Sequence, residues 1–321
     1  MKKHGSQNLI LLLILVGVSL VLSLASQNFS SGYNVLNILR QVSLTVISAS
    51  VVTLVMISGG LDLSIGGVLA LAGVVAARLS VAGLPLPLAF LAGVLVGVVS
   101  GALNGSLIIT TGIPPVIATL GTMYISRGLA YILSNGSAVV NGLPDGFGVV
   151  GETHFGPLPL LVVLMAMVIV ICHFLLTKTV LGRHIYAIGG NLQAANLAGI
   201  PVKRIKLLLY TLSGTMAGVS GILLASRLSS GDPNVGIGFE FDVIVAIVLG
   251  GASLAGGAGT LSGTLLGALI LAVFANGMNL LGMESYTQQV VLGAVILGAV
   301  LLDKLRSGAG VRLFRAKPAA A

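Results

Sequence analysis

The sequence predicts an all-α, polytopic membrane protein with about ten transmembrane helices, and three observations lead to this fold class. Of the 321 residues, 56% are hydrophobic and only 7% are charged, with a mean hydropathy of +1.11. A soluble domain carries roughly 25% charged residues. Apolar runs of about 20 residues, the length that crosses a bilayer as a helix, recur along the chain. They lack the strict alternation of membrane strands, so helices are expected.

Ten spans are expected, several of them interrupted by glycine. The first run follows two lysines and imitates a signal peptide, but its length favours a retained first helix. The expected ranges are roughly 9–25, 35–58, 66–83, 88–110, 116–134, 158–177, 205–227, 241–256, 262–281 and 286–302. We expect residues 1–321 to form a single transmembrane domain.

The basic residues predict which side of the membrane each loop faces. Twelve of the 16 Lys and Arg residues fall near the N-terminus, in residues 178–206 and in residues 304–317. Cytoplasmic loops are enriched in Lys and Arg. Ten spans place all three clusters on one side, so both termini, the 178–204 loop and the 307–321 tail are expected to be cytoplasmic. The net charge of +8 comes without an aromatic-interleaved basic patch, which argues against nucleic-acid binding.

The motifs of catalysis are absent from the sequence. It contains no phosphate-binding G-x-x-x-x-G-K-[ST] segment and no G-x-S-x-G segment. The four histidines are not at metal-ligand spacing, and the single cysteine, Cys172, lies in an apolar run. We therefore expect no enzyme activity, cofactor or metal on this chain.

The loop 178–204 contains a short helix with clear ends. Gly189 and Gly190 break the chain, Asn191 is a good N-cap, and "LQAANLA" continues for about two turns. Gly199 and Pro201 then stop the helix. So short a helix must dock on something. The helix could dock on membrane headgroups. A protein groove fits better, because the helix has small side chains that allow a close approach, those of Ala194, Ala195 and Ala198.

Two glycine-rich segments echo each other, "GGLDLSIGGVLALAG" (59–73) and "GGASLAGGAGTLSGTLLGALI" (250–270). Paired, glycine-interrupted segments in two halves point to the central pathway of a transporter. Close helix packing by small residues is the alternative. Asp62 in the first segment favours a functional role.

Asp62 has three interpretations. Its carboxylate and the Ser64 hydroxyl can bond backbone N–H groups that the glycines free, so that Asp62 caps the start of the third span. It can line the solute path near a cytoplasmic gate, which is compatible with capping. Proton coupling is the third interpretation.

Four long motifs, in order, resemble the permeases of ATP-binding cassette (ABC) sugar importers of the ribose type, the branch that includes ribose, xylose, galactose and autoinducer-2 permeases. They are "SGGLDLSIGGVLALAG", "LGRHIYAIGGNLQAANLAGI", "FEFDVIVAIVLGGASLAGGAGTLSGTLLGALI" and "NGMNLLG". The resemblance covers about residues 29–305. It implies that two ATPase subunits, which bind ATP and Mg, dock on a coupling helix. It also implies a periplasmic or lipid-anchored sugar-binding protein and a second permease copy or paralogue, in the bacterial inner membrane and in contact with lipid.

Candidate site residues follow. Those for coupling to the ATPase are Gly182, Arg183, Gly190, Asn191, Ala194, Ala195 and Gly199. Those for the path or gate are Gly59, Gly60, Asp62, Ser64, Gly66, Asn104, Asn276 and Asn279. The asparagines can instead make helix–helix hydrogen bonds.

Four arginines, Arg40, Arg78, Arg127 and Arg227, fall toward the outer membrane edge. They act as interfacial anchors or meet acidic groups of the binding protein, and Arg78 and Arg227 are the candidates for that docking.

The predicted function is that of the membrane subunit of an ATP-driven, binding-protein-dependent importer of a monosaccharide, with ribose or another pentose first. Alternating access would be driven by separate ATPase subunits. The alternatives are import of another small solute, such as a nucleoside, a branched-chain amino acid or autoinducer-2, and an ATP-independent secondary transporter.

Overall fold

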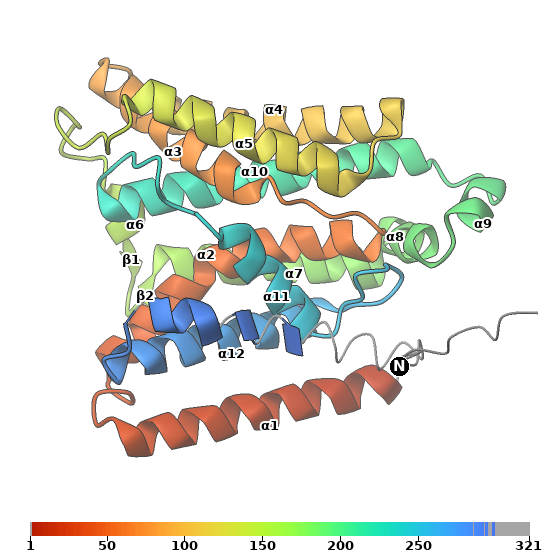
Figure 1. The fold of residues 1–321 in the computed structure, drawn as a ribbon, viewed down its shortest axis with the longest axis horizontal. Helices are drawn as coiled ribbons and strands as arrows, with labels where there is room; N and C mark the ends of the chain where they lie inside the picture. Colours follow the sequence, from red (N-terminus) through yellow and green to blue (C-terminus); the bar gives the residue numbers. More distant parts are fainter. Residues whose placement is uncertain (1, 285, 292, 295–296, 299–321) are drawn as a thin grey trace, which may run out of the picture.

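The computed structural model describes residues 2–284, 286–291, 293–294 and 297–298 (Figure 1). Within these ranges, helices form nearly all of the regular structure, and one two-stranded hairpin interrupts them. The bounds are α1 Lys2–Ala25, α2 Gly32–Ile57, α3 Ile65–Val81, α4 Leu86–Thr111, α5 Pro115–Ser134, α6 Val149–Glu152, β1 His154–Phe155, β2 Leu158–Pro159, α7 Leu160–Lys178, α8 Val180–Gly190, α9 Leu192–Leu197, α10 Val202–Leu228, α11 Phe239–Leu249 and α12 Leu261–Leu280.

Seven of these helices, α1, α2, α4, α5, α7, α10 and α12, are long and apolar enough to cross a membrane. The all-α membrane fold class is therefore confirmed. The shorter helix α3 is also apolar, with 17 residues. The expected tenth span, 286–302, lies partly outside the described residues, and the expected 307–321 tail lies wholly outside them.

The expected eighth span, 241–256, is wrong in its extent. Helix α11 has 11 residues, which at 1.5 Å per residue make about 16 Å, roughly half of a bilayer core. Residues 250–260 that follow are not helical, and Gly251, Gly256, Gly257 and Gly259 in this stretch have positive φ. The glycines permit a backbone that ends the helix inside the protein.

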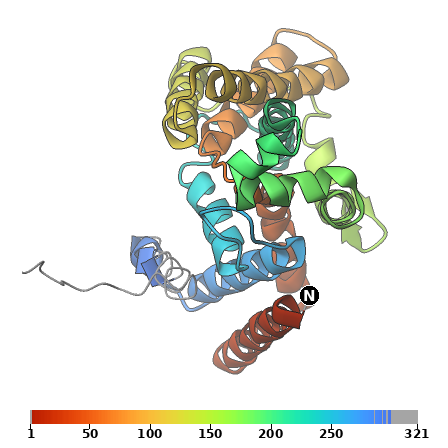
Figure 2. The same cartoon turned by 90° about the vertical axis from the view of Figure 1, so that its right-hand side faces the viewer.

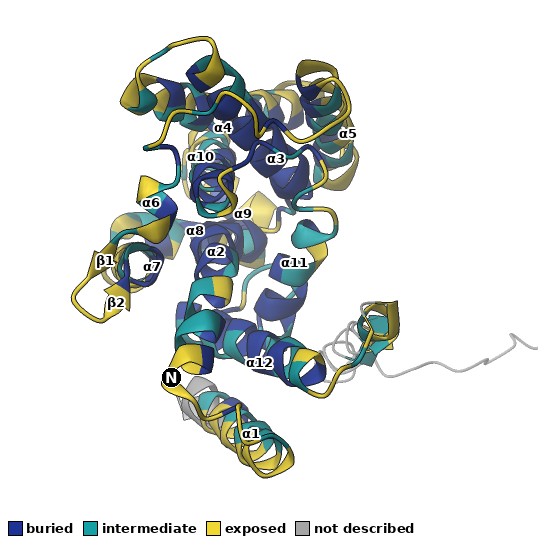
Figure 3. Cartoon of the chain, turned by 90° about the vertical axis from the view of Figure 1, so that its left-hand side faces the viewer, coloured by how far each residue is buried: buried dark blue, intermediate teal, exposed yellow. Residues whose placement is uncertain are grey.

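Helices α2 and α10 lie at the centre of the molecule. Helix α10 packs against α2, α3 and α4, while α2 also packs against α7, α11 and α12. Helices α2 and α3 are largely buried, whereas α1 and α5 lie at the edge with many exposed apolar side chains (Figure 3). Helix α1 packs along α12 (Figure 2). Exposed apolar faces at the edge suit a protein surrounded by lipid.

Glycine permits the closest helix contact, between α4 and α10. A Cβ on Gly101 would lie 2.9 Å from the Cα of Thr211, and one on Gly214 would lie 2.8 Å from the Cα of Gly101. Such distances leave no room for a side chain, so the two backbones touch. Small residues that let membrane helices approach explain part of the 45 glycines.

The helices run between two ends of the molecule. The start of α1, the helices α8 and α9 and the connection between α4 and α5 lie at one end, here called the α9 end (Figure 1). The connections 82–85 and 135–148 lie at the opposite end, with the β1–β2 hairpin, and the 229–238 connection runs from that end back to the start of α11 in the middle of the molecule.

Candidate functional site

Asp62 lies in the break between α2 and α3 and is fully buried. Its Oδ1 accepts hydrogen bonds from the Ser64 backbone N–H at 2.9 Å and from the Ser64 hydroxyl at 2.6 Å. Its Oδ2 accepts a hydrogen bond at 2.6 Å from the hydroxyl of Ser213 on α10. Helix α3 begins at Ile65, so Asp62 holds the turn that starts this helix and ties it to α10.

Polar bonds continue from Ser64 across the bundle. Asn104 on α4 donates from Nδ2 to Ser64 Oγ at 2.9 Å, and Thr122 on α5 donates to Asn104 Oδ1 at 2.6 Å. Four helices thus meet in one hydrogen-bonded chain that starts at Asp62. The chain connects these helices and fixes their relative positions.

The two glycine-rich breaks touch each other and the loop between α7 and α10. Gly257 in the 250–260 segment donates its N–H to the carbonyl of Ile57, the last residue of α2, at 2.8 Å. A Cβ on Gly256 would lie 2.9 Å from the Cα of Gly59, which has φ +74°. The repeated segments seen in the sequence are therefore side by side in space.

Helix α8 completes this glycine junction, which we define as Gly59, Gly189, Gly256 and Gly257. A Cβ on Gly189 would lie 2.6 Å from the backbone N of Gly257 and would also clash with the carbonyl of Ile57. Tyr186, one turn earlier, donates its hydroxyl to the carbonyl of Gly259 at 2.7 Å. Helix α8 is thus in direct contact with both breaks.

The short helix expected after Gly190 is α9, and its ends are as the sequence predicted. Asn191 Oδ1 accepts a hydrogen bond from the Ala194 N–H at 2.9 Å, and Gly199 has φ +74°. Helix α8, however, was not expected. It runs through Gly189 and Gly190 and ends only at the extended Asn191.

The candidate coupling residues divide into two groups. Arg183, Gly190, Asn191, Ala194 and Gly199 are exposed. Gly182 and Ala195 are buried: Gly182 lets α8 approach the end of α7, and Ala195, 3% exposed, packs in the core with Ile185 and Ile188. These two residues hold the loop in place from within. The apolar surface of α9 comes instead from Leu192 and Leu197, exposed to 45% and 90%.

Two cavities with polar side chains in their walls lie along α2, and Gln41 lines both. The first, of about 430 Å³, opens toward the end opposite α9 and is lined by Asn34, Asn37, Gln41, Asn276 and Asn279, among others. Asn34 and Asn276 exchange amide hydrogen bonds of 2.9 and 2.8 Å, so this pair joins α2 to α12. Asn279 is exposed and accepts from Gln288 at 2.7 Å.

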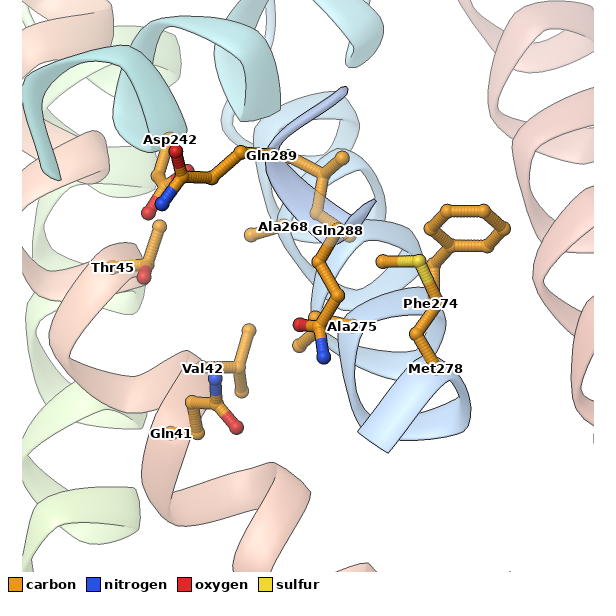
Figure 4. Close-up of a pocket in the computed structure, with 12 residues that line it drawn as sticks. Gln41, Val42, Thr45, Asp242, Ala268, Phe274, Ala275, Met278, Gln288 and Gln289 are labelled. Carbon is orange, nitrogen blue, oxygen red and sulfur yellow. The ribbon is translucent and has the colours of Figure 1, made fainter. Parts of the chain in front are cut away.

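The second cavity, of about 240 Å³, lies deeper between α2, α11, α12 and the helical residues 286–291 (Figure 4). Its polar side chains are those of Gln41, Thr45, Asp242, Gln288 and Gln289. Figure 4 shows these side chains on both walls, with Asp242 and Gln289 at one edge. The sequence analysis did not identify any of these five residues.

Two of the arginines toward the opposite end, Arg78 and Arg127, bind backbone carbonyls of their own chain. Arg78 donates from Nε to the Leu133 carbonyl at 2.6 Å, near the end of α5. Arg127 donates to the carbonyl of Pro233 at 2.6 Å and to that of Val235, which fixes the 232–238 connection. Arg127 thus points inward rather than out toward the membrane surface. Arg227 is half-buried in the last turn of α10.

Gly66 and Gly60 are both packing positions. Gly66 lies under the buried carboxylate of Glu240, and a Cβ there would also lie 2.5 Å from the carbonyl of Gly236. Gly60 faces Tyr210, whose hydroxyl would lie 2.6 Å from an added Cβ and donates to the Leu61 carbonyl at 3.3 Å. Both glycines let neighbouring helices close on the turn that holds Asp62.

Comparison with known proteins decides the family. Residues 34–300 match the model of a family described as "Branched-chain amino acid transport system / permease component". The chain belongs to this family of transport permeases. Three relatives resemble the permease over most of both chains.

The ribose import permease protein RbsC of Bacillus subtilis is 43% identical to the permease over 289 residues, which are 90% of each chain. The D-allose permease AlsC of Escherichia coli is 38% identical over 286 residues, 89% of this chain and 87% of AlsC. The L-arabinose ABC transporter permease AraH of Azospirillum brasilense is 40% identical over 286 residues, 89% of this chain and 84% of AraH. No solved structure gives a significant match.

These matches confirm the resemblance to ribose-type ABC permeases that the motifs indicated. They also confirm that the permease is a multi-pass protein of the inner membrane. The family is one of transport components rather than of enzymes. The roles of individual residues rest on the geometry above.

Proposed function

We propose that this permease is the membrane subunit of an ATP-driven, binding-protein-dependent importer of a monosaccharide, with ribose or another pentose as substrate. The observation that carries the proposal is the 43% identity to a ribose import permease over 90% of both chains. The relatives named for allose and arabinose are 38% and 40% identical and support the same class of solute.

The α9 end faces the cytoplasm in this proposal, and the chain forms one permease domain of ten spans. The start of α1 lies at that end, as do Lys178 at the end of α7, Arg183 in α8 and Lys203 in the first turn of α10. This distribution follows the tendency of cytoplasmic loops to carry Lys and Arg. Both termini, including residues 307–321, are then cytoplasmic.

ATPase subunits, which would bind ATP and Mg, dock on α9 through Leu192 and Leu197. Exposed leucines on a six-residue helix outside the apolar bundle call for a partner surface. The glycine junction connects α8, directly before α9, to the ends of α2 and α11. Movement of the docked ATPase would therefore reach both breaks and reopen the spans to one side.

The opposite end receives a sugar-binding protein, and a second permease copy or a paralogue completes the assembly. Arg78 and Arg227 lie at this end in the last turns of α3 and α10, and Asp232 is half-buried in the adjoining connection. Mixed charges at this surface suit a soluble partner that must dock and leave.

Co-purification tests the proposal. The tagged chain is extracted from its native host in mild detergent, and the proteins that accompany it are identified by mass spectrometry. We expect a stoichiometric ATPase subunit, which Leu197→Ser reduces by roughly tenfold, as expected when one buried apolar anchor is lost. The control is Val140→Ser, because Val140 is 51% exposed in the 135–148 connection at the opposite end. A chain that purifies alone and still transports without ATP would instead be a secondary transporter.

A further inference from the structure

A row of polar side chains follows one face of α2. Asn34, Asn37, Gln41 and Thr45 are spaced by three, four and four residues, the spacing that places side chains on one side of a helix. Eleven residues rise about 16 Å, roughly half of a bilayer core of about 30 Å. The row therefore leads from the end opposite α9 to the middle of the membrane.

The two cavities beside this row adjoin at Gln41, which lines both. The part of the row nearest the end opposite α9 is fixed, because Asn34 forms hydrogen bonds with Asn276 and with the Phe29 carbonyl. In the deeper cavity, Gln41, Thr45 and Asp242 face the open space with no side-chain hydrogen bond to the described part of the chain. Polar groups at this depth are costly in lipid unless they meet a partner.

The lining of the deeper cavity defines the chemistry of that partner. Amide, hydroxyl and carboxylate groups together donate and accept hydrogen bonds, as a ligand with several hydroxyls requires. Phe274 and Met278 supply an apolar wall for carbon–hydrogen faces. Among the lining residues in the described part of the chain, no Lys, Arg or His lies beside Asp242. An anionic solute would meet a carboxylate with no compensating cation, which is unfavourable in a low-dielectric site.

We propose that the two cavities that adjoin at Gln41 form the entry half of the solute path, and that Gln41, Thr45 and Asp242 bind a neutral, polyhydroxylated solute there. The site selects against phosphorylated sugars and against solutes that carry a free carboxylate. This inference rests on the proposed import function and names the residues that recognise the solute.

Cysteine chemistry tests the path independently of transport. In the assembled importer, Thr45→Cys is placed in a Cys172→Ser background, so that it carries the chain's only thiol. The matched control is Val99→Cys, because Thr45 and Val99 are each the fourteenth residue of a 26-residue helix. Val99 is 56% exposed on the outer side of α4, where lipid would cover it. Membrane-impermeant methanethiosulfonates are added from the side opposite α9.

We expect position 45 to react and position 99 to remain unmodified. A cationic reagent should modify position 45 roughly tenfold faster than an anionic one, relative to their rates with a free thiol, because Asp242 lies in the same cavity. Asp242→Asn should remove this preference. Excess D-ribose with the binding protein should slow the modification several-fold, whereas D-ribose 5-phosphate should not.

Transport measurements separate this inference from the proposed function. In the same vesicles, Gln41→Leu should reduce ribose uptake roughly tenfold, the effect of losing one good hydrogen bond to the solute, and Gln41→Asn should recover part of it. The ATPase content should not change. If uptake depends on ATP but position 45 does not react, or reacts without ribose protection, the path inference is wrong. If uptake is independent of ATP, the proposed function is wrong, while the thiol data still locate the path.

Discussion

Replacing Asp62 by alanine removes the centre of the hydrogen-bonded chain that joins α3, α4, α5 and α10. The substitution deprives three donors of their acceptor: the N–H and the hydroxyl of Ser64 and the hydroxyl of Ser213. Asp62, Ser64 and Ser213 are all buried, with exposed fractions of 0–1%. The lost hydrogen bonds lie in the break between α2 and α3, which also contains Gly59 of the glycine junction.

The size of the effect follows from these three bonds. A buried donor left without a partner costs about 1–3 kcal/mol. The hydroxyls can rotate to other acceptors and the backbone N–H cannot, so we expect a total of roughly 3–6 kcal/mol. For a chain of 321 residues, the usual unfolding entropy per residue makes 1 kcal/mol worth about 1.5 °C in Tm. Asp62→Ala should therefore lower the Tm by roughly 5–9 °C. Asp62→Asn keeps one acceptor oxygen and should lower it by about 2–3 °C.

The native cysteine supplies the assay. Cys172 is 4% exposed and is the chain's only cysteine, so a thiol-reactive dye reports its exposure as the purified protein is heated. Ser213→Ala tests the cross-helix bond, and Ser50→Ala is its control. Ser50 is equally buried but bonds the Val46 carbonyl of its own helix at 2.6 Å. Equal melting temperatures for Asp62→Ala and Ser50→Ala would refute the assigned role.

Three further substitutions test the loop and the junction. Gly189→Ala should reduce ATP-driven uptake at least tenfold by forcing α8 off the end of α2, whereas Gly190→Ala, whose Cβ meets nothing within 4 Å, should transport normally; equal uptake by both would contradict the junction. Ala195→Arg should lower the Tm because it buries a guanidinium, and an unchanged Tm would show that α9 is not held from within. Gly66→Ala should displace Glu240 and reduce the yield of folded protein. Size-exclusion chromatography measures this yield, and an unchanged peak of folded protein would contradict the prediction.

Local chemistry explains what the sequence predicted well. The ends of α9 depend on Asn191 and Gly199, which lie within a few residues of the helix that they limit. The long apolar helices follow from composition. The same reasoning missed α8, because two adjacent glycines at its end indicate a break. It overextended α11, because hydropathy does not register that the glycines after Leu249 leave helical geometry.

Contacts between distant residues could not be predicted from one sequence. Asp62 and Ser213 are 151 residues apart, and Asn34 and Asn276 are 242 apart. Nothing near these residues in the chain identifies the partner. The deeper cavity is a similar case, because Gln41 and Asp242 line the same cavity only when α2 and α11 pack together. Ala195 likewise reads as a surface alanine until α9 folds back on the bundle.

Uptake by the complete importer tests the central claim most directly. The permease, its co-purified ATPase and its binding protein are reconstituted in vesicles, with ATP supplied on the side of the α9 end. Uptake of labelled ribose, another pentose and leucine is then compared with and without ATP. The account predicts ATP-dependent uptake of a monosaccharide and none of leucine. Leucine uptake without sugar uptake, or equal sugar uptake in the absence of ATP, would contradict it.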